Sequence, residues 1–309
     1  MASLKEIKGR IASVSSTLKI TSAMKMVASA KLRKAQNAIG NMVAYQKGLQ
    51  RILDDLTAGT PVDFGPLLPV PEDDAPVRSG VALVCFSSNS SLCGAFNSNA
   101  IRQTLSVIDE YRSAGFTDEN IIVYSVGRKI AEAMRKAGFP SPEDYSKMAE
   151  SPGYEAASAL AKELIEGHLS GRFVKVELVY NHFKSTSSQP TVRETYLSAT
   201  NSPGQQTADY QSQPGQPSSV ATHAPCDDII VEPSRDAVLG VLLPKVLRLK
   251  IYATLLDSNA AEHAARTVAM QTATDNGNDL LEELTLEYNK GRQQKITSEI
   301  LDIVGGSLR

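Results

Sequence analysis

The first sixty residues carry an apolar or small side chain at intervals of three and four residues. The ladder comprises Leu4, Ile7, Ile11, Val14, Leu18, Ala28, Leu32, Ala35, Ile39, Met42, Leu49, Leu53 and Leu56. Only the polar residues Thr21, Lys25 and Gln46 interrupt it. A heptad repeat of this length predicts one long helix over residues 1–60, with a narrow apolar seam along one side. At 1.5 Å per residue that helix is about 80 Å long, so it needs a partner of similar length.

A second long helix is predicted at the other end of the chain, over residues 229–309. Its inner positions are small: Ala260, Ala261, Ala264, Ala265, Ala269, Ala273 and Gly277. No turn signal divides either terminal helix into the shorter pieces of a helical bundle, so we expect one antiparallel two-helix coiled coil. Pro244 lacks a backbone donor and predicts a helix start, break or kink within about one turn of it.

The middle of the chain has a different pattern. A proline-rich linker is predicted at residues 61–77, followed by a central α/β domain at 78–198. Strands are expected at 81–86, 121–126, 173–183 and 191–197, and helices at 97–113, 128–137 and 154–169. Alternation of strands and helices predicts an open, Rossmann-like sheet that is parallel at its start. Residues 199–228 have almost no large apolar side chains, which predicts a flexible polar excursion. The expected fold is an α/β head on a long coiled coil.

The predicted head lacks the motifs of the enzymes that share this kind of sheet. The turn after the first strand reads SSNSSLCGAFN in place of GxGxxG, and GxxxxGK[ST] and HExxH are absent from the sequence. The four histidines are scattered without metal-ligand spacing. Cys93 lies in a glycine-containing turn and is expected to be a packed small residue rather than a nucleophile. We therefore predict no catalytic, cofactor-binding or metal-binding residues.

Charge and cysteine content limit the possible partners and compartments. The chain has a net charge of −2, but residues 1–36 contain eight basic residues and only one acidic one, Glu6. Such a helix is suited to acidic partner surfaces. The same charges would also fit a solvated face or a DNA contact of the basic-zipper kind. In a zipper the basic region precedes the heptads, whereas here the two overlap, which counts against DNA. An odd number of cysteines without CxxC spacing favours a reducing compartment. Apolar runs fall short of the ~18 residues that a membrane-spanning helix needs.

Several blocks of the sequence, in order, resemble the gamma subunit family of F-type ATP synthases. They lie at residues 5–36, at the head turn SLCGAFN of residues 91–97, at 261–276 and at 288–309. The sequence departs from the family pattern at Ser307, where alanine is usual, and in the length of residues 198–228. Because the resemblance starts within a few residues of Met1, we expect no transit peptide and a bacterial source.

The resemblance implies a non-catalytic rotor, the central stalk of the enzyme. Such a stalk transmits torque between the membrane ring of c subunits and the catalytic ring of alpha and beta subunits, coupling proton flow to ATP synthesis and regulating ATPase activity. The implied partners are the alpha, beta and epsilon subunits and the c-subunit ring, with no cofactor, nucleic acid or small-molecule substrate. The implied location is peripheral, on the cytoplasmic side of the bacterial inner membrane. Two alternatives remain open: a passive coiled-coil scaffold, and an α/β enzyme with helical arms.

The resemblance also places contact residues on the shaft. It puts Arg266, Arg292, Gln293 and Thr297 at loops of the beta subunits, where arginine can bind a carboxylate with two donors. Residues 296–304 are expected to enter the collar of the ring as a lone apolar tip, because the first helix is too short to cover them. With Met24 and Lys25, which interrupt the seam opposite Arg266, the predicted ring contacts are Met24, Lys25, Arg266, Arg292, Gln293, Thr297, Ile300 and Val304. The alternative for each charged residue is an ordinary solvated position. Candidates for the foot are residues 54–60 and 225–233.

Overall fold

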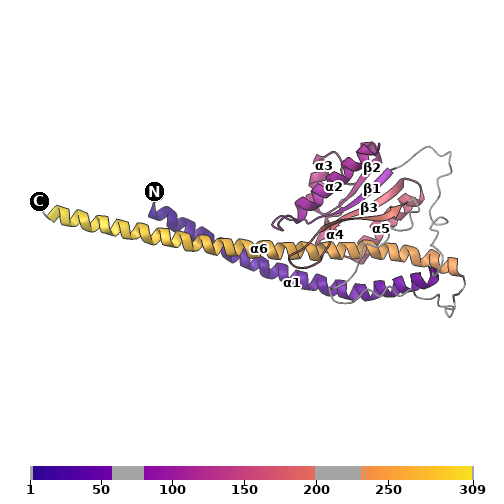
Figure 1. Cartoon of the computed structure of the whole chain (residues 1–309), viewed down its shortest axis with the longest axis horizontal. Coiled ribbons are helices and arrows are strands. Elements are labelled where there is room, and N and C mark those ends of the chain that lie inside the picture. Colours follow the sequence, from indigo (N-terminus) through magenta and orange to yellow (C-terminus); the bar gives the residue numbers. More distant parts are fainter. Residues whose placement is uncertain (1–2, 58–79, 199–230, 233, 308–309) are drawn as a thin grey trace.

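A computed structural model describes residues 3–57, 80–198, 231–232 and 234–307. The linker predicted at 61–77 and the excursion predicted at 199–228 lie outside the described residues, as do most of the residues proposed for the foot. The described residues form a long two-helix shaft with a compact head on one side of it (Figure 1).

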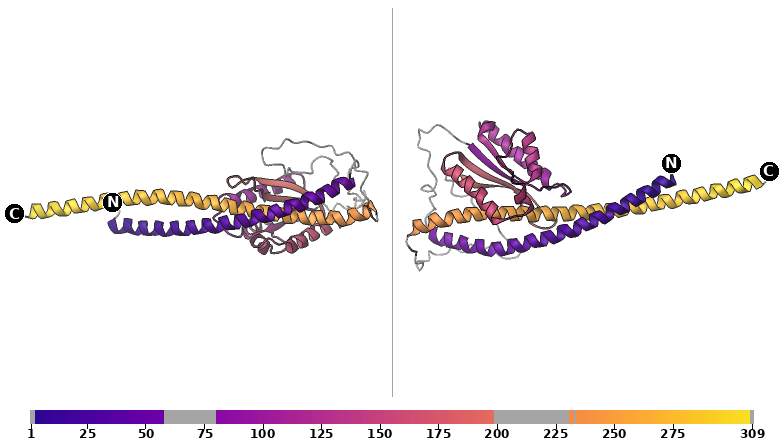
Figure 2. Two further views of the ribbon diagram at one scale, coloured as in Figure 1. Left: turned by 90° about the horizontal axis from the view of Figure 1, so that it is seen from below. Right: turned by 180° about the vertical axis from the view of Figure 1, so that it is seen from behind.

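The shaft consists of α1 (Leu4–Thr57) and α6 (Arg235–Ser307). The two helices run antiparallel and cross each other at a shallow angle, as the views in Figure 2 show. The head lies against α6 towards the end where α1 finishes, whereas the C-terminal turns of α6 project beyond the start of α1. This arrangement confirms the predicted fold class, an α/β head carried by an antiparallel coiled coil of the terminal helices.

The seam of α1 is the predicted ladder. Every ladder position from Leu4 to Leu56 is buried or half-buried, including the three polar interruptions, and most positions between them are exposed. One interruption has a partner: Thr274 Oγ1 donates a hydrogen bond to Thr21 Oγ1 over 3.1 Å. Polar pairs at seam positions of a coiled coil fix its register at some cost in stability. We interpret the Thr21–Thr274 pair in this way.

Leucine lies over glycine at two other levels of the same seam. A Cβ atom added to Gly277 would lie 2.6 Å from Leu18 Cδ2, and one added to Gly291 would lie 3.1 Å from Leu4 Cδ2. The separation of the two leucines along α1 equals that of the two glycines along α6, as a constant antiparallel register requires. The missing side chains on α6 therefore provide the space that the leucines of α1 fill.

Helix α6 is continuous through Pro244, so a start or a break there is wrong, whereas the kink stays a prediction. The helix begins later than residue 229 because Ser234 caps it: the Ala237 N–H donates to Ser234 Oγ over 3.3 Å, and the Val238 N–H donates to the Ser234 carbonyl. Pro244 removes one hydrogen bond to the carbonyl of Gly240, a loss of about 3 kcal/mol in an isolated helix. Packing of α6 against α1 and the head over many turns outweighs that loss.

The head is a four-stranded sheet in the order β2-β1-β3-β4. Its strands are β1 (Gly80–Phe86), β2 (Ile121–Val126), β3 (Phe173–Asn181) and β4 (Thr191–Ser198). β1 pairs in parallel with β2 and β3, and β3 pairs antiparallel with β4. These strands match the predicted ones within two residues at each end. The short helices η1 (Asp118–Asn120) and α4 (Ser146–Glu150) were not predicted, since neither is long enough to show a hydrophobic period.

Helices cover both faces of this sheet. Alternate β1 residues point to opposite sides: Leu83 packs with α2 (Phe96–Ser113) and α3 (Arg128–Lys136), and Val84 packs with α5 (Tyr154–Leu169) and α6. Ile251 and Leu255 of α6 are almost completely buried in that second layer. Helix α6 is thus part of the shaft and part of the core of the head. No helix in the described part of the chain is long and apolar enough to cross a membrane.

Candidate functional site

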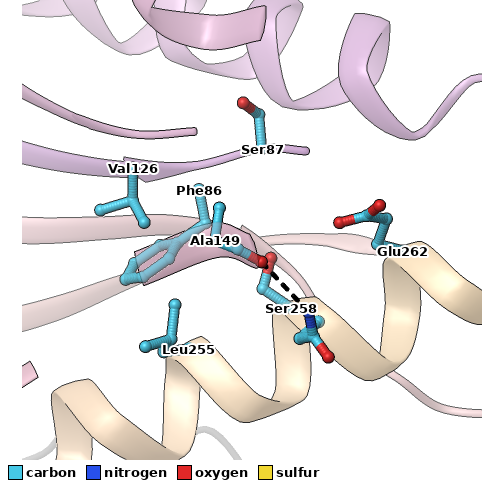
Figure 3. A pocket seen from close by; sticks show the side chains of 8 residues that line it. Phe86, Ser87, Val126, Ala149, Leu255, Ser258 and Glu262 are labelled. Carbon is cyan, nitrogen blue, oxygen red and sulfur yellow. Dashed lines mark hydrogen bonds between the residues drawn. The ribbon is translucent and has the colours of Figure 1, made fainter. Parts of the chain in front are cut away.

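The place where open α/β sheets usually bind ligands is filled by α6. Such ligands lie in the crevice beyond the carboxyl ends of the parallel strands. Here Phe86 and Val126, at the ends of β1 and β2, line a cavity of about 10 Å³ that Leu255, Ser258 and Glu262 of α6 close from the other side (Figure 3). Ligand sites usually measure about 300–1,000 Å³. This cavity has no room for a nucleotide.

Arg266 lies in the junction between head and shaft, and its predicted contact with a beta subunit stays a prediction. Its side chain is only 10% exposed. Nη1 donates to the Ser91 carbonyl over 2.6 Å, and Nη2 donates to Glu262 Oε1 over 2.6 Å. These bonds join the loop after β1 to α6. The resemblance alone could not show this, because burial of Arg266 depends on where the head packs.

Burial also affects the titration of the neighbours of Arg266. Burial raises the pKa of Glu262, and Arg266 and Lys31 oppose that effect. Burial, followed by the charges of Lys31 and Arg266, lowers the pKa of His263 to about 4. His263 is therefore neutral at physiological pH and adds no positive charge to this junction.

A second polar contact joins head and shaft through Asp257 of α6. His182 Nδ1 lies 2.6 Å from Asp257 Oδ2, and the Phe183 N–H donates to Asp257 Oδ1 over 2.9 Å. The hydrogen bond to Asp257 raises the pKa of His182 above its usual value, although burial opposes the shift. Protonated His182 thus forms a charge-assisted bond to a nearly buried carboxylate.

We expect the contribution of His182 to stability to decrease as pH rises. A histidine whose pKa is raised on folding contributes fully below its unfolded pKa of about 6.5 and loses that contribution as pH passes the folded pKa. The difference in free energy of unfolding between the unmodified chain and His182→Gln should be about 1 kcal/mol at pH 6 and smaller at pH 8.5. Denaturant titrations at both pH values measure it.

His168→Gln provides a control of opposite sign. Burial lowers the pKa of His168, so its contribution should be lost as pH falls rather than as it rises. A difference for His182→Gln that stays constant from pH 6 to pH 8.5 would contradict the predicted charge-assisted bond.

The remaining predicted contacts on α6 lie where that helix meets no other described part of the chain. Leu4, near the start of α1, packs at Gly291. The next residues, Arg292, Gln293 and Thr297, are exposed. Ile300 and Val304 are 54% and 53% exposed, and Ile296, Leu301 and Ile303 are exposed as well. The structure therefore places these five predicted contacts together on one uncovered segment, residues 292–304, which we call the tip.

The apolar side of the tip does not continue the coiled-coil seam. The seam passes through Leu284, Tyr288 and Gly291, and the next positions in the same spacing are polar: Lys295, Ser298 and Asp302. At about 100° per residue, Ile296, Ile300 and Ile303 lie roughly 100–160° around the helix from the seam line, so the apolar stripe faces away from α1. A longer α1 would not cover it. The tip is shaped for a different partner.

Met24 and Lys25 are half-buried, with Lys25 at a position of the seam and Met24 next to it, and the residues that follow them are more exposed. Met26 and Val27 are 71% and 57% exposed, and Val268 of α6, which the register puts at the same level, is 38% exposed. Met26 and Val27 are apolar residues off the heptad ladder, and this signal in the sequence could have identified them as exposed contact residues. Leu92, in the loop that Arg266 binds, is also exposed, and no sequence pattern pointed to it.

Comparison with known proteins agrees with this architecture. The family model described as ATP synthase matches residues 3–308. The ATP synthase gamma chain of Phocaeicola vulgatus is 53% identical over 308 residues, covering 100% of both chains. That of Flavobacterium johnsoniae is 39% identical over 307 residues, covering 99% of this chain and 98% of the relative.

Solved structures show the same fold at low identity. A chain of the Euglena gracilis mitochondrial ATP synthase (OSCP/F1/c-ring, rotational state 3) has a TM-score of 0.58 and 16% identity, with 99% of this chain and 93% of that chain covered. A chain of the rotor of the same enzyme has a TM-score of 0.56 and 17% identity, covering 95% and 98%. By the family model and by full-length identity to bacterial relatives, the chain belongs to the ATP synthase gamma chain family.

Proposed function

We propose that this chain turns as the central stalk of a bacterial ATP synthase and transmits torque between a membrane ring of c subunits and a catalytic ring of alpha and beta subunits. As a gamma chain it is a non-catalytic subunit of the complex. The observation that carries the proposal is the tip: a single helix with an exposed apolar stripe, at the far end of a shaft from its head. No described part of the chain covers that stripe, so we assign it a partner in another subunit.

The proposed contact with the ring has two levels. At the first level, the apolar stripe of the tip lies in a collar of the ring. Arg292, Gln293 and Thr297 of the same segment bind loops of the ring beside the collar. At the second, Met24, Lys25 and their exposed neighbours form a band around the shaft. Arg266 stays a predicted contact as well, although its guanidinium is engaged within the chain. An asymmetric shaft can drive three identical sites through different states only by making different contacts with each.

The opposite end of the shaft is proposed to face the membrane. There the chain would bind the ring of c subunits and an epsilon subunit, as a peripheral protein on the cytoplasmic side of the inner membrane. The Euglena structures that share this fold, an F1/c-ring assembly and a rotor, support an assembly of this kind. Proton flow through the membrane ring would then be coupled to ATP synthesis, and ATPase activity regulated, through the shaft.

An ATPase assay separates this proposal from the two alternatives. The isolated chain should neither hydrolyse ATP nor bind it with micromolar affinity, because α6 fills the place where the sheet would hold a nucleotide. Adding alpha and beta subunits should produce ATP hydrolysis. In membranes that also carry the ring of c subunits, that hydrolysis should drive proton pumping. Nucleotide binding by the isolated chain would favour an enzyme with helical arms, and failure to join the ring would favour a passive scaffold.

Arg292 tests the charged part of the tip contact. Truncating one partner of a shielded ion pair costs about 2–5 kcal/mol, so Arg292→Ala should weaken assembly or coupling without changing nucleotide chemistry in a formed ring. Arg292→Lys should rescue only in part, because lysine lacks the two-donor geometry. ATP-driven proton pumping is measured beside ATPase rate, with the exposed Lys290→Ala as control. Unchanged pumping and hydrolysis in both Arg292 variants would make Arg292 a solvated charge.

A further inference from the structure

We infer that two groups of polar contacts, which we call clasps, fasten the head to different sides of α6. The first is made by Arg266 and the second by Asp257. We also infer that Arg266 is a positioning residue that holds the loop Ser87–Gly94 on the shaft. The structural part of this inference stands on intrachain contacts alone. Its consequence for torque rests on the proposed function.

The loop Ser87–Gly94 follows β1 and crosses α6. Its Ser91 carbonyl accepts the hydrogen bond from Arg266, and a Cβ atom added to Gly94 would lie 4.0 Å from Ala269 Cβ. Cys93 is buried beneath the loop in a small apolar cluster with Phe96 and Ala261. The loop therefore has one strong polar attachment to α6, with van der Waals contacts after it.

The backbone of this loop is strained at Leu92. Its φ is +67°, a left-handed conformation that leucine rarely adopts, and among the described residues no other non-glycine residue has a positive φ. The side chain is 57% exposed, so burial of Leu92 does not hold it there. Residues in such conformations persist where their surroundings determine them. Here the surroundings are the Ser91–Arg266 bond before Leu92, and buried Cys93 after it.

The second clasp lies on another side of the helix. Asp257 binds His182 and the Phe183 N–H, in the segment that joins β3 to β4. Five residues separate Asp257 from Glu262, which corresponds to a rotation of about 140° around the helix. The head therefore binds two sides of α6. Because of these two attachments, rotation of α6 about its axis must turn the head as well.

Glu262 keeps Arg266 in position. Both side chains are about nine-tenths buried, and the 2.6 Å bond between them satisfies the carboxylate and orients the guanidinium towards Ser91. Removing one member of a buried pair leaves the other charge uncompensated. With its guanidinium so oriented, Arg266 acts through the loop: it places Leu92 at the level of Met26 and Val27, in the band proposed to face the ring.

Labelling of Cys93 in the full chain tests the clasp. A thiol reagent is applied, and peptide mass spectrometry separates Cys93 from Cys85 and Cys226. Arg266→Gln should speed labelling of Cys93 at least tenfold, with Arg266→Lys intermediate, because lysine must reach Ser91 and Glu262 from one nitrogen and lacks the planar fork of arginine. Glu262→Gln should also accelerate it. Arg102→Gln, an exposed arginine of α2, is the matched control and should match the unmodified chain.

Circular dichroism confirms that each variant is folded, and the lysine variant keeps the test valid if Arg266→Gln unfolds. Equal labelling rates in folded Arg266→Lys, folded Glu262→Gln and the unmodified chain would overturn the clasp. The functional consequence is tested in the assembled complex with Leu92→Asn, since asparagine tolerates the left-handed conformation but removes the apolar side chain.

Leu92→Asn should leave Cys93 labelling unchanged and lower the ratio of protons pumped to ATP hydrolysed at least twofold. A ratio equal to that of the unmodified complex would overturn the role of Leu92. If the unmodified complex itself pumps no protons, the proposed function fails, whereas the labelling result still decides whether the clasp exists.

Discussion

Replacing Gly277 with leucine is expected to disrupt the packing of α1 against α6. The added side chain would enter space already filled by Leu18, because even a Cβ atom at Gly277 lies 2.6 Å from Leu18 Cδ2 and 3.2 Å from Leu18 Cγ. Overpacking of this kind costs about 1–3 kcal/mol, and leucine returns about 1 kcal/mol of helix propensity. Denaturant unfolding followed by circular dichroism measures the net change.

Gly48→Leu is the matched control for this experiment. Gly48 also lies in a shaft helix, but nothing would contact a Cβ atom there. That variant should gain the helix propensity without the clash, so the two variants should differ by about 1–3 kcal/mol in free energy of unfolding. The double variant Leu18→Ala, Gly277→Leu exchanges the large and small sides and should recover most of the difference. Equal stability of Gly277→Leu and Gly48→Leu would contradict the observed register.

Aspartate at Ile300 and Val304 together is expected to abolish coupling while leaving the fold intact. Both side chains are exposed in the isolated chain, and surface substitutions of this kind change stability by within about 0.5 kcal/mol each. In a ring that surrounds the tip, two carboxylates would be transferred into an apolar collar. Burying unpaired charge is strongly unfavourable, so the tip should no longer seat. ATP-driven proton pumping in membrane vesicles should be lost.

The opposite face of the same helix provides the control. Gln294→Asp with Ser298→Asp adds the same charge to the tip at polar, exposed positions. We expect this pair to keep most of the pumping activity. If both pairs lose pumping equally, general charge repulsion explains the loss and the apolar stripe has no special role. If neither pair loses pumping, the tip is not seated in an apolar collar.

Much of the architecture follows from local periodicity that the sequence displays. The ladder of α1 predicted its buried side, because a seam at a spacing of 3.5 residues leaves little choice of face. Strands such as Ile121–Val126 and helices such as Tyr154–Leu169 were predicted at their observed bounds, since each is a run of one period between turn signals. The uncovered tip also followed, from the unequal lengths of the two terminal helices.

The sequence could not decide which residues of distant segments contact each other. A heptad repeat looks the same after every shift of seven residues, so the pairing of Leu18 with Gly277 required the two helices together. Arg266 reads as one more charge on a long helix, and only the packing of the head turns it inward onto Ser91. The continuity of α6 through Pro244 has the same origin. Periodicity along the chain determined the elements, whereas contacts between distant segments decided the register, the buried charges and the strained loop, because those depend on energies that no single segment contains.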